Sequence, residues 1–317
     1  MDGFLITGGA GFLGSHLAER LLRAGRRVAI LDNFDDYYAP ELKRANLREV
    51  STSGRFEIYE VDIRDGAKLP AAFRSFQPEA VVHLAARPGV RASFLRPEEC
   101  VSANVLGTTH VLEACRQNGV RRLVFASSSS VYGDSCPAPF REDAPTGRPL
   151  SIYAASKAAG EALCFTYSQA YALPVVCARL FTAFGPRQRP DLAIRKFADL
   201  ILAGDEVPVF GDGSLQRDFT YVDDIVEGMV RALEVPAAFE IVNLGNSHPV
   251  RVDHLVETLA RELGKPARIK FITVPAGEMA LTHADLSKAR QLLGYSPKVS
   301  FEDGLRAYVA WLKARHS

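Results

Sequence analysis

The sequence predicts an α/β protein with a doubly wound parallel sheet, followed by a smaller C-terminal substrate-binding part. Short apolar runs of strand length alternate with helical patterns over residues 3–126, and this alternation is typical of a parallel sheet covered by helices. A glycine-rich turn separates the first run from the first helix. Polar residues follow most of the runs, at the carboxyl edge where such sheets bind ligands.

Composition narrows the class of protein. The 317 residues are 47% hydrophobic and 24% charged, which suits one large domain with an appendage or two domains. A net charge of +1 argues against nucleic acid or an anionic membrane as the main partner. No apolar run approaches the ~20 residues that span a bilayer. The five cysteines are scattered without metal spacing, so we expect reduced thiols, no metal and a cytoplasmic location.

The first strand and helix have the pattern of a dinucleotide-binding unit. Gly3 to Thr7 is apolar, and a glycine turn and a helical pattern up to Gly25 follow. Glycines let backbone N–H groups approach a pyrophosphate at a helix N-terminus. The next strand, Arg27 to Leu31, ends at an acid placed to bind the adenosine ribose. That charge favours NAD over NADP, although Lys43 and Arg44 leave NADP open. The predicted contacts here are Gly8, Gly11, Phe12, Leu13, Gly14, Asp32 and Asn33.

Three further strands add candidate cofactor contacts at the same edge. We expect strands over residues 56–61, 80–84 and 122–126, with a long helix over 98–118 between the last two. The strand ends supply small or polar residues that suit close approach of a dinucleotide. The predicted contacts are Asp62, Ile63, Leu84, Ala85, Ala86, Arg87, Asn104 and Ser127.

The candidate catalytic residues lie at the start of an alanine-rich helix predicted over residues 151–171. Tyr153 and Lys157 are four residues apart and so share one helical face. A nearby ammonium would lower the pKa of the phenol, which could then accept a proton from an alcohol. This spacing alone more often means a packed Tyr over a solvated Lys. With the glycine turn upstream, we expect a catalytic pair, with Ser128 bonded to the reacting oxygen.

The second half has weaker patterns. Residues 181–221 are rich in Pro, Gly and charge, which predicts an irregular segment with one helix near 192–202. Later patterns predict helices over 222–234, 252–263 and 301–315 and a strand over 239–244. We divide the chain into an NAD-binding domain of residues 1–180 plus about 222–250 and a second domain of residues 181–221 plus 251–317, which the family resemblance given next implies to be the nucleotide-sugar-binding domain.

Together these motifs resemble the extended short-chain dehydrogenase/reductase superfamily, whose core is a Rossmann fold. The resemblance rests on the three glycines, Asp32, 62–63, 83–86, 127–133 and the Tyr153/Lys157 pair. Residues 179–181, 209–213, 217–224 and 284–285 resemble the substrate-binding portion of sugar-nucleotide epimerases and dehydratases. The resemblance implies a UDP-sugar substrate and a homodimer formed through residues 98–118 and 151–171. The implied substrate contacts are Arg91, Ser128, Ser129, Ser130, Thr182, Arg189, Val209, Phe210, Arg217 and Glu278.

The serine loop indicates which reaction of the superfamily is expected. The dehydratases place Asp and Glu where this chain has Ser129 and Ser130, and a hydroxyl is a poor base for a carbon acid. The decarboxylases usually carry Glu at the position that corresponds to Ser130 of this chain, immediately before Val131. What remains is epimerisation at C4, in which Tyr153 takes the 4-hydroxyl proton while NAD takes a hydride and returns it to the opposite face of a 4-keto sugar. Tyr153 and Lys157 are also expected cofactor contacts, with Lys157 on the nicotinamide ribose.

Two stretches resemble the UDP-glucuronate 4-epimerases more than the UDP-galactose 4-epimerases. They are residues 32–38 with 42–44, and residues 181–191. A 4-keto uronate is a β-keto acid that can lose CO2, and hydroxyls with a cation could hold its carboxylate. Thr182, Arg189 and the serine loop are the candidates. The alternatives are a UDP-glucose/UDP-galactose or N-acetylhexosamine 4-epimerase and, less favoured, a UDP-glucuronate decarboxylase or a non-catalytic NAD-binding sensor.

Overall fold

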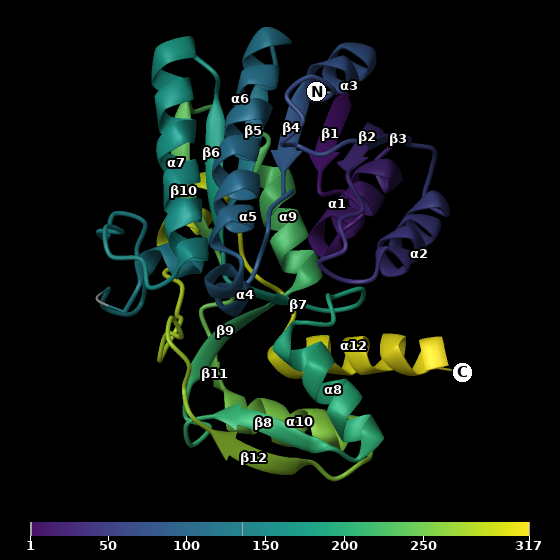
Figure 1. The fold of residues 1–317 in the computed structure, drawn as a ribbon, viewed down its shortest axis with the longest axis vertical. Coiled ribbons are helices and arrows are strands. Elements are labelled where there is room, and N and C mark those ends of the chain that lie inside the picture. Colours follow the sequence, from purple (N-terminus) through teal and green to yellow (C-terminus); the bar gives the residue numbers. More distant parts are fainter. Residues whose placement is uncertain (1, 135, 317) are drawn as a thin grey trace.

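A seven-stranded parallel sheet forms the centre of the computed structural model, which describes residues 2–134 and 136–316 (Figure 1). Its strand order is β10-β6-β5-β4-β1-β2-β3, so the order reverses between β1 and β4, where such sheets bind ligands. The strands are β1 (Gly3–Thr7), β2 (Arg27–Asp32), β3 (Glu57–Glu60), β4 (Ala80–His83), β5 (Arg122–Ser128), β6 (Val175–Leu180) and β10 (Phe239–Leu244). The fold class predicted from the sequence is therefore confirmed.

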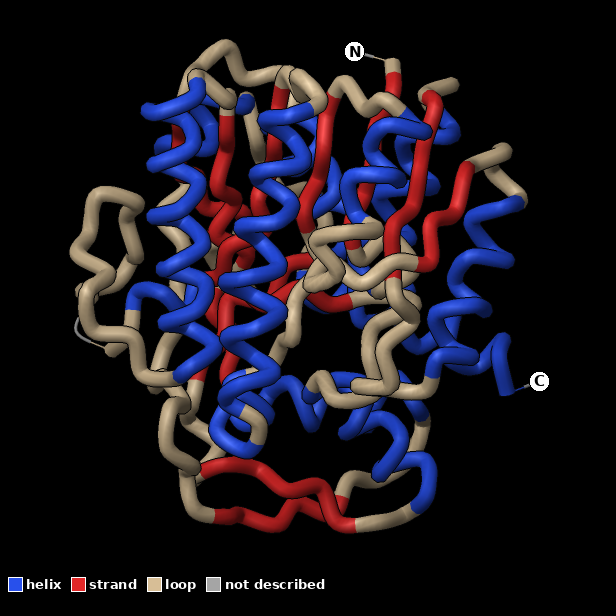
Figure 2. Tube along the Cα trace, turned by 45° about the horizontal axis from the view of Figure 1, so that its top comes forward, coloured by secondary structure: helices blue, strands red, loops and turns tan. Residues whose placement is uncertain are grey.

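Helices cover both faces of this sheet (Figure 2). One apolar layer includes residues of α1 (Phe12–Arg23), α2 (Pro40–Ser51) and α9 (Val222–Ala232). The other includes residues of α3 (Leu69–Phe76), α6 (Gly107–Gln117) and α7 (Ile152–Tyr171). Neighbouring strand residues go to opposite layers, as Leu5 does relative to Phe4 and Ile6. Because both faces are buried, the inner strands β1, β2 and β4 are almost continuously apolar, whereas the edge strand β3 is largely exposed.

The helix expected over residues 98–118 is helical but not uniform. It follows α4 (Val90–Leu95) and consists of α5 (Pro97–Val101), a π-helical turn η1 (Ser102–Leu106) and α6. Asn104 lies in the wide turn, is buried, and bonds the backbone N–H and C=O of Arg87 at 2.7 and 3.0 Å. The wide turn therefore uses this side chain to fix the segment after β4.

A smaller part lies beyond the carboxyl ends of the main strands (Figure 1). It contains a three-stranded sheet of order β11-β9-β7 and a two-stranded sheet of β12 and β8. Its elements are β7 (Thr182–Phe184), α8 (Ala193–Ala203), β8 (Glu206–Phe210), β9 (Gln216–Tyr221), β11 (Pro249–Arg251), α10 (Val252–Leu263), β12 (Arg268–Ile272) and α12 (Phe301–His316), whereas α11 (Ser287–Leu293) contacts β10 and α9.

The irregular segment expected over residues 181–221 is a wrong prediction, because three strands lie in it. β8 tolerates Pro208 since it pairs with a single neighbour, β12, and an edge strand need not donate every N–H. β9 pairs with β7 and with the distant β11. Within the described ranges, no helix is long and apolar enough to cross a membrane.

Candidate active site

A cavity of about 450 Å³ opens at the carboxyl ends of the sheet and extends to the smaller part. Most of the predicted site residues line it. On the main-sheet side these are Gly8, Gly11, Phe12, Leu13, Gly14, Asp32, Asn33, Asp62, Ile63, Leu84, Ala85, Ala86, Arg87, Ser127, Ser128, Ser129, Ser130, Tyr153 and Lys157, and on the other side Thr182, Arg189, Arg217 and Glu278. Strand ends and loops far apart in the sequence thus meet around one space.

The glycine turn has the shape that a dinucleotide requires. A Cβ at Gly14 would lie 2.6 Å from the Cα of Gly9, so only glycine allows α1 to start this close to β1. A Cβ at Gly11 would meet only Gly8 O and Tyr38 Oη within 4 Å, at 3.2 and 3.9 Å. The first turn of α1 carries no acid. The N-terminus of α1 therefore faces open space suited to a pyrophosphate.

Asp32 fixes the turn as well as ending β2. Its Oδ2 accepts a hydrogen bond from Ala10 N at 3.1 Å and its Oδ1 accepts one from Phe34 N at 2.9 Å. Burial raises the pKa of Asp32, and Lys43, with its Nζ 3.7 Å from Oδ1, opposes that rise. Lys43 also donates to the carbonyl of Asp35 at 2.9 Å, so its ammonium is already engaged on the protein.

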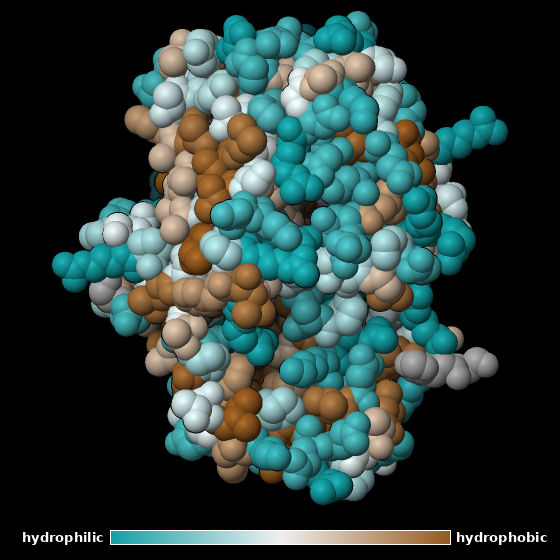
Figure 3. All heavy atoms as spheres, in the orientation of Figure 1, coloured by the Kyte–Doolittle hydropathy of each residue, from teal (hydrophilic) through white to brown (hydrophobic). Residues whose placement is uncertain are grey.

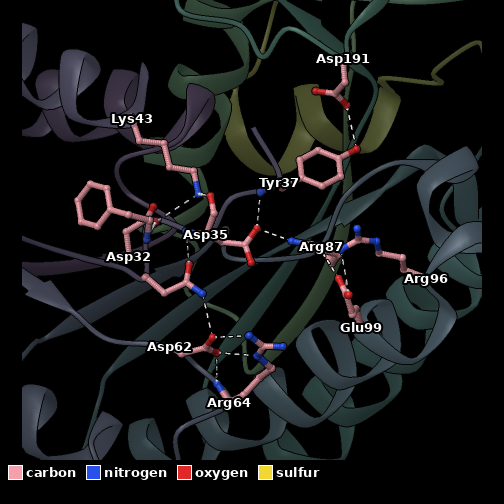
Figure 4. A network of polar contacts seen from close by, with 12 residues as sticks. Asp32, Asp35, Tyr37, Lys43, Asp62, Arg64, Arg87, Arg96, Glu99 and Asp191 are labelled. Atoms are coloured by element: carbon pink, nitrogen blue, oxygen red, sulfur yellow. Dashed lines mark hydrogen bonds and ion pairs between the residues drawn. The ribbon is translucent and has the colours of Figure 1, made fainter. Parts of the chain in front are cut away.

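Charged pairs connect the segment after β2 with its surroundings (Figure 4). Asp62 accepts from Asn33 Nδ2 at 2.8 Å and from Arg64, and the Arg64 bonds are the main reason why its pKa falls to about 2. Arg87 forms ion pairs with Asp35 and with Glu99 of α5. Arg87 therefore joins the segment after β2 to α5.

Lys157 lies against β5 at the inner side of the cavity. Ser151 is the N-cap residue that precedes α7, and its Oγ accepts a hydrogen bond from Ala154 N at 3.1 Å. Further along, Gly160 packs on the ring of Phe125 with no room for a Cβ. Lys157 Nζ donates to the carbonyl oxygen of Ala126 at 2.7 Å, and burial lowers the pKa of this lysine to about 8.

The expectation that Lys157 lowers the pKa of Tyr153 is wrong for this structure. Burial raises the pKa of Tyr153, and the groups that oppose the rise are Ser128, through a hydrogen bond, and the charge of Arg189. Lys157 Nζ is 6.0 Å from the tyrosine ring centroid and is bonded to a carbonyl instead. Desolvation of a buried phenolate outweighs what these neighbours contribute.

The serines of the 127–130 loop differ in which groups their side chains contact. Ser127 Oγ donates to Glu161, which forms a buried two-point ion pair with Arg179 at 2.9 and 2.8 Å, so the Ser127 side chain is held by the protein interior. Ser128 Oγ accepts from the backbone N and the Oγ of Ser130, at 3.2 and 3.0 Å. Ser128 is therefore bonded to Ser130 and lies near enough to the Tyr153 phenol to oppose the rise of its pKa.

Two arginines face the cavity from the smaller part. Arg189 pairs with Asp191 through Nε–Oδ1 at 2.9 Å and Nη2–Oδ2 at 3.1 Å. Arg217 Nη2 donates to Glu278 Oε2 at 2.9 Å. These are the donors that carboxylate and phosphate groups require.

Four predicted residues do not line the cavity. Asn104 is buried and instead accepts a hydrogen bond from the backbone N–H of Arg87, which does line the cavity. Val209 is fully buried in β8, and the guanidinium of Arg91 lies 5.3 Å from the ring centroid of Phe210. Sequence reasoning in turn missed lining residues, among them Asp35, Tyr37, Tyr38, Arg64, Glu99, Met279 and Thr282. The acidic-aromatic run 35–38, inside a stretch already singled out, was a usable signal for the first three.

Metal chemistry has no visible support in the part of the chain that the structure describes. No three His, Cys, Asp or Glu side chains there gather as metal ligands. All five cysteines are free thiols.

A Rossmann sheet with a glycine turn, a Tyr/Lys pair on one helix and a serine at the neighbouring strand end defines an extended short-chain dehydrogenase/reductase. Residues 4–245 match the model of the NAD dependent epimerase/dehydratase family. The chain belongs to this family, and NAD is its cofactor.

Similar proteins cover the chain from end to end. A UDP-glucuronate 4-epimerase of Thermodesulfobacterium geofontis is 41% identical over 99% of this chain and 97% of its own length. The crystal structure of UDP-glucuronic acid 4-epimerase from Bacillus cereus in complex with UDP-glucuronic acid and NAD has a TM-score of 0.92 at 37% identity, covering 99% of both chains. The UDP-glucose 4-epimerase of Thermus thermophilus, in complex with NAD, has a TM-score of 0.89 at 34% identity, covering 98% of this chain and 99% of that one.

Proposed function

We propose that the protein is an NAD-dependent UDP-sugar 4-epimerase that interconverts UDP-glucuronate and UDP-galacturonate. The observation that carries the choice of sugar is the position of Arg189, which lines the same cavity as Tyr153 and the serine loop. A cation in the same cavity as the reacting phenol suits a sugar whose C5 carries a carboxylate, next to the reacting C4. The UDP-glucuronate 4-epimerases among its relatives support this choice.

Proton transfer is assigned to Tyr153. NAD, when bound, supplies the acceptor and donor of hydride for C4 of the sugar. Tyr153 accepts the proton of the 4-hydroxyl in its phenolate form, which Ser128 and the charge of Arg189 favour against the cost of burial, and later returns it, while Ser128 orients the sugar oxygen. Lys157, held on the carbonyl of Ala126, keeps a cation beside the pair.

The cofactor site is assigned to groups with open faces toward the cavity. The N-terminus of α1 at Gly11 would take the pyrophosphate, and Asp32 and Asp62, at the ends of β2 and β3, would take the adenosine end. The Arg87 link between the segment after β2 and α5 lines the same space.

The carboxylate is the hazardous group of this substrate. A 4-keto uronate loses CO2 when the bond to its carboxylate aligns with the carbonyl π system. We assign Thr182, Arg189 and the hydroxyls of 128–130 to holding the carboxylate out of that alignment and in its ionised form. Ser129 and Ser130 also leave the site without the acid and base that elimination of water needs.

A homodimer is the proposed assembly, and the apolar side chains gathered over α6 and α7 support it (Figure 3). Val101 and Leu106, which precede α6, and Phe165 of α7 are about half exposed, and exposed apolar side chains that gather on one face mark an interaction site. Sedimentation of the wild type and of Phe165→Asp tests this, since the variant should sediment as a monomer. A cytoplasmic location stays a prediction.

Proton NMR of the purified protein with UDP-glucuronate tests the function. We expect UDP-galacturonate with neither CO2 release nor accumulating NADH, and slower conversion of UDP-glucose. UDP-xylose or a free 4-keto sugar as the product would refute the proposal, and faster conversion of UDP-glucose would favour the glucose/galactose alternative that the Thermus thermophilus relative represents.

Two arginine variants test the choice of sugar. Arg189→Met should raise CO2 release per turnover. Arg195→Met, which breaks a comparable arginine–aspartate pair outside the cavity, with Asp199 on α8, should not. Equal CO2 release by the two variants would remove Arg189 from the carboxylate site.

A further inference from the structure

The segment between β2 and α2 lies on the cofactor side, yet it is one of the two stretches that resemble the UDP-glucuronate 4-epimerases. Asn33 and Asp35 account for its cofactor-side contacts, through Asp62 and Arg87. Neither contact explains why this segment would vary with the sugar. Tyr37, which also lines the cavity, offers an explanation.

The ring of Tyr37 points away from Asp35 and toward Asp191 (Figure 4). Its hydroxyl donates to Asp191 Oδ2 at 3.1 Å. That carboxylate holds Arg189 through both of its oxygens, at 2.9 and 3.1 Å. The guanidinium of Arg189 also lies 5.9 Å from the centroid of the tyrosine ring. One side chain from the cofactor side thus contacts both members of the ion pair.

The surroundings of Tyr37 are built to hold the hydroxyl in this place. Its backbone N–H donates to Asp35 Oδ1 at 2.8 Å, and Asp35 is itself paired with Arg87. A Cβ at Gly89, which has a φ of +98°, would lie 2.8 Å from the tyrosine oxygen. Only a glycine therefore leaves room for the hydroxyl.

The hydroxyl remains a donor at every working pH. Burial, followed by the charge of Asp191, raises the pKa of Tyr37 to about 12. A neutral phenol that donates to a carboxylate fixes the direction of that carboxylate without adding charge. Arg189 is then held at a planar two-point contact, the geometry in which a guanidinium keeps its remaining N–H groups aimed at a second anion.

We propose that Tyr37 is a positioning residue that acts through Asp191 to aim Arg189 at the carboxylate of the sugar, and so contributes to specificity for a uronate. This inference rests on the proposed function. It explains why the segment between β2 and α2, which lies on the cofactor side, resembles the corresponding segment of enzymes that act on UDP-glucuronate.

The test compares Tyr37→Phe with Tyr59→Phe, each in a Tyr153→Phe background that prevents turnover. Tyr59 also donates its hydroxyl to a carboxylate, Glu57, but lies outside the cavity on β3. Calorimetry on the NAD-loaded protein gives the dissociation constants of UDP-glucuronate and of UDP, which lacks the sugar. Tyr37→Phe should weaken UDP-glucuronate binding by about 5- to 10-fold, part of the value of a hydrogen bond to a charged group, and leave UDP binding unchanged. Tyr59→Phe should change neither.

An Asp191→Ala background shows whether Tyr37 acts through Asp191. There the change Tyr37→Phe should weaken UDP-glucuronate binding no further. A further loss of similar size, or equal weakening of UDP and UDP-glucuronate, would overturn the inference. If binding follows the expected pattern but protein with Tyr153 intact does not interconvert UDP-glucuronate, the proposed reaction fails and the inference stands.

Discussion

Replacing Lys157 with Met should make the fold more stable while removing its activity. Lys157 is 4% exposed, and its polar contact is with the carbonyl of Ala126 rather than with an acid. Lowering its pKa from 10.5 to about 8 corresponds to about 3 kcal/mol of destabilisation at neutral pH, at about 1.4 kcal/mol per pKa unit. Loss of the hydrogen bond to Ala126 would offset about 1–2 kcal/mol of the gain. A net gain of about 1–2 kcal/mol remains.

The pH dependence gives this prediction its signature. Below pH 8 the lysine is charged in both the folded and the unfolded chain, so the whole penalty is present. Between pH 8 and 10.5 the unfolded chain binds one more proton than the folded chain, and the stability of the wild type therefore rises with pH. Lys157→Met lacks this rise and also lacks the hydrogen bond to Ala126, so its advantage at pH 7 should turn into a small disadvantage by pH 10.5.

Urea unfolding of dinucleotide-stripped protein at pH 7, 9 and 10.5 measures this difference. An NMR assay with UDP-glucuronate should show activity at least about 100-fold lower in the variant, the usual scale of acid–base catalysis. NAD should raise the melting temperature of the wild type by more than that of the variant. A variant that is less stable than the wild type at pH 7, or whose stability relative to the wild type does not fall between pH 7 and pH 10.5, would refute the reasoning.

Three further predictions follow from the site. Tyr153→Phe should lower kcat by about 10²- to 10⁴-fold with an unchanged NAD content in the purified protein; half the wild-type rate by NMR would exclude a proton-transfer role. Gly14→Ala should weaken NAD binding by at least about 10-fold and destabilise the fold by about 1–3 kcal/mol in titration and melting experiments, whereas Gly147→Ala, where a Cβ has open space, should do neither, and equal behaviour of the two would contradict the packing argument. Arg217→Met should weaken UDP binding by about 10-fold or more in calorimetry and reduce its salt dependence, because Arg217, now paired with Glu278 at 2.9 Å, would turn to the diphosphate; unchanged affinity would place the phosphates elsewhere.

Local spacing accounts for what could be predicted from the sequence. The glycine turn, the acid at the end of β2 and the Tyr153/Lys157 pair each depend on residues a few positions apart or on the end of a buried strand, and the structure brings them to one cavity. Over residues 181–221, by contrast, the prediction of an irregular segment from composition was wrong. The strands there gain their partners from residues that follow much later, as β8 does from β12, and no local pattern encodes such pairing.

The energetics of the site were also beyond sequence reasoning. The spacing of Tyr153 and Lys157 placed them on one face but could not reveal that burial dominates the pKa of both. The contact between Tyr37 and Asp191 joins residues 154 positions apart, so it exists only through the fold.

The position of β10 has a consequence for how this chain is made. Among the residues that the structure describes, β10 pairs only with β6 and completes the sheet, but its residues follow α8, β8 and β9 of the smaller part in the chain. At about 5–20 residues per second, a ribosome needs several seconds to travel from the end of β6 to the end of β10. During that time the edge of β6 that will pair with β10 has no partner strand, and unpaired strand edges favour aggregation. Slow translation of residues 181–238 would prolong this exposure.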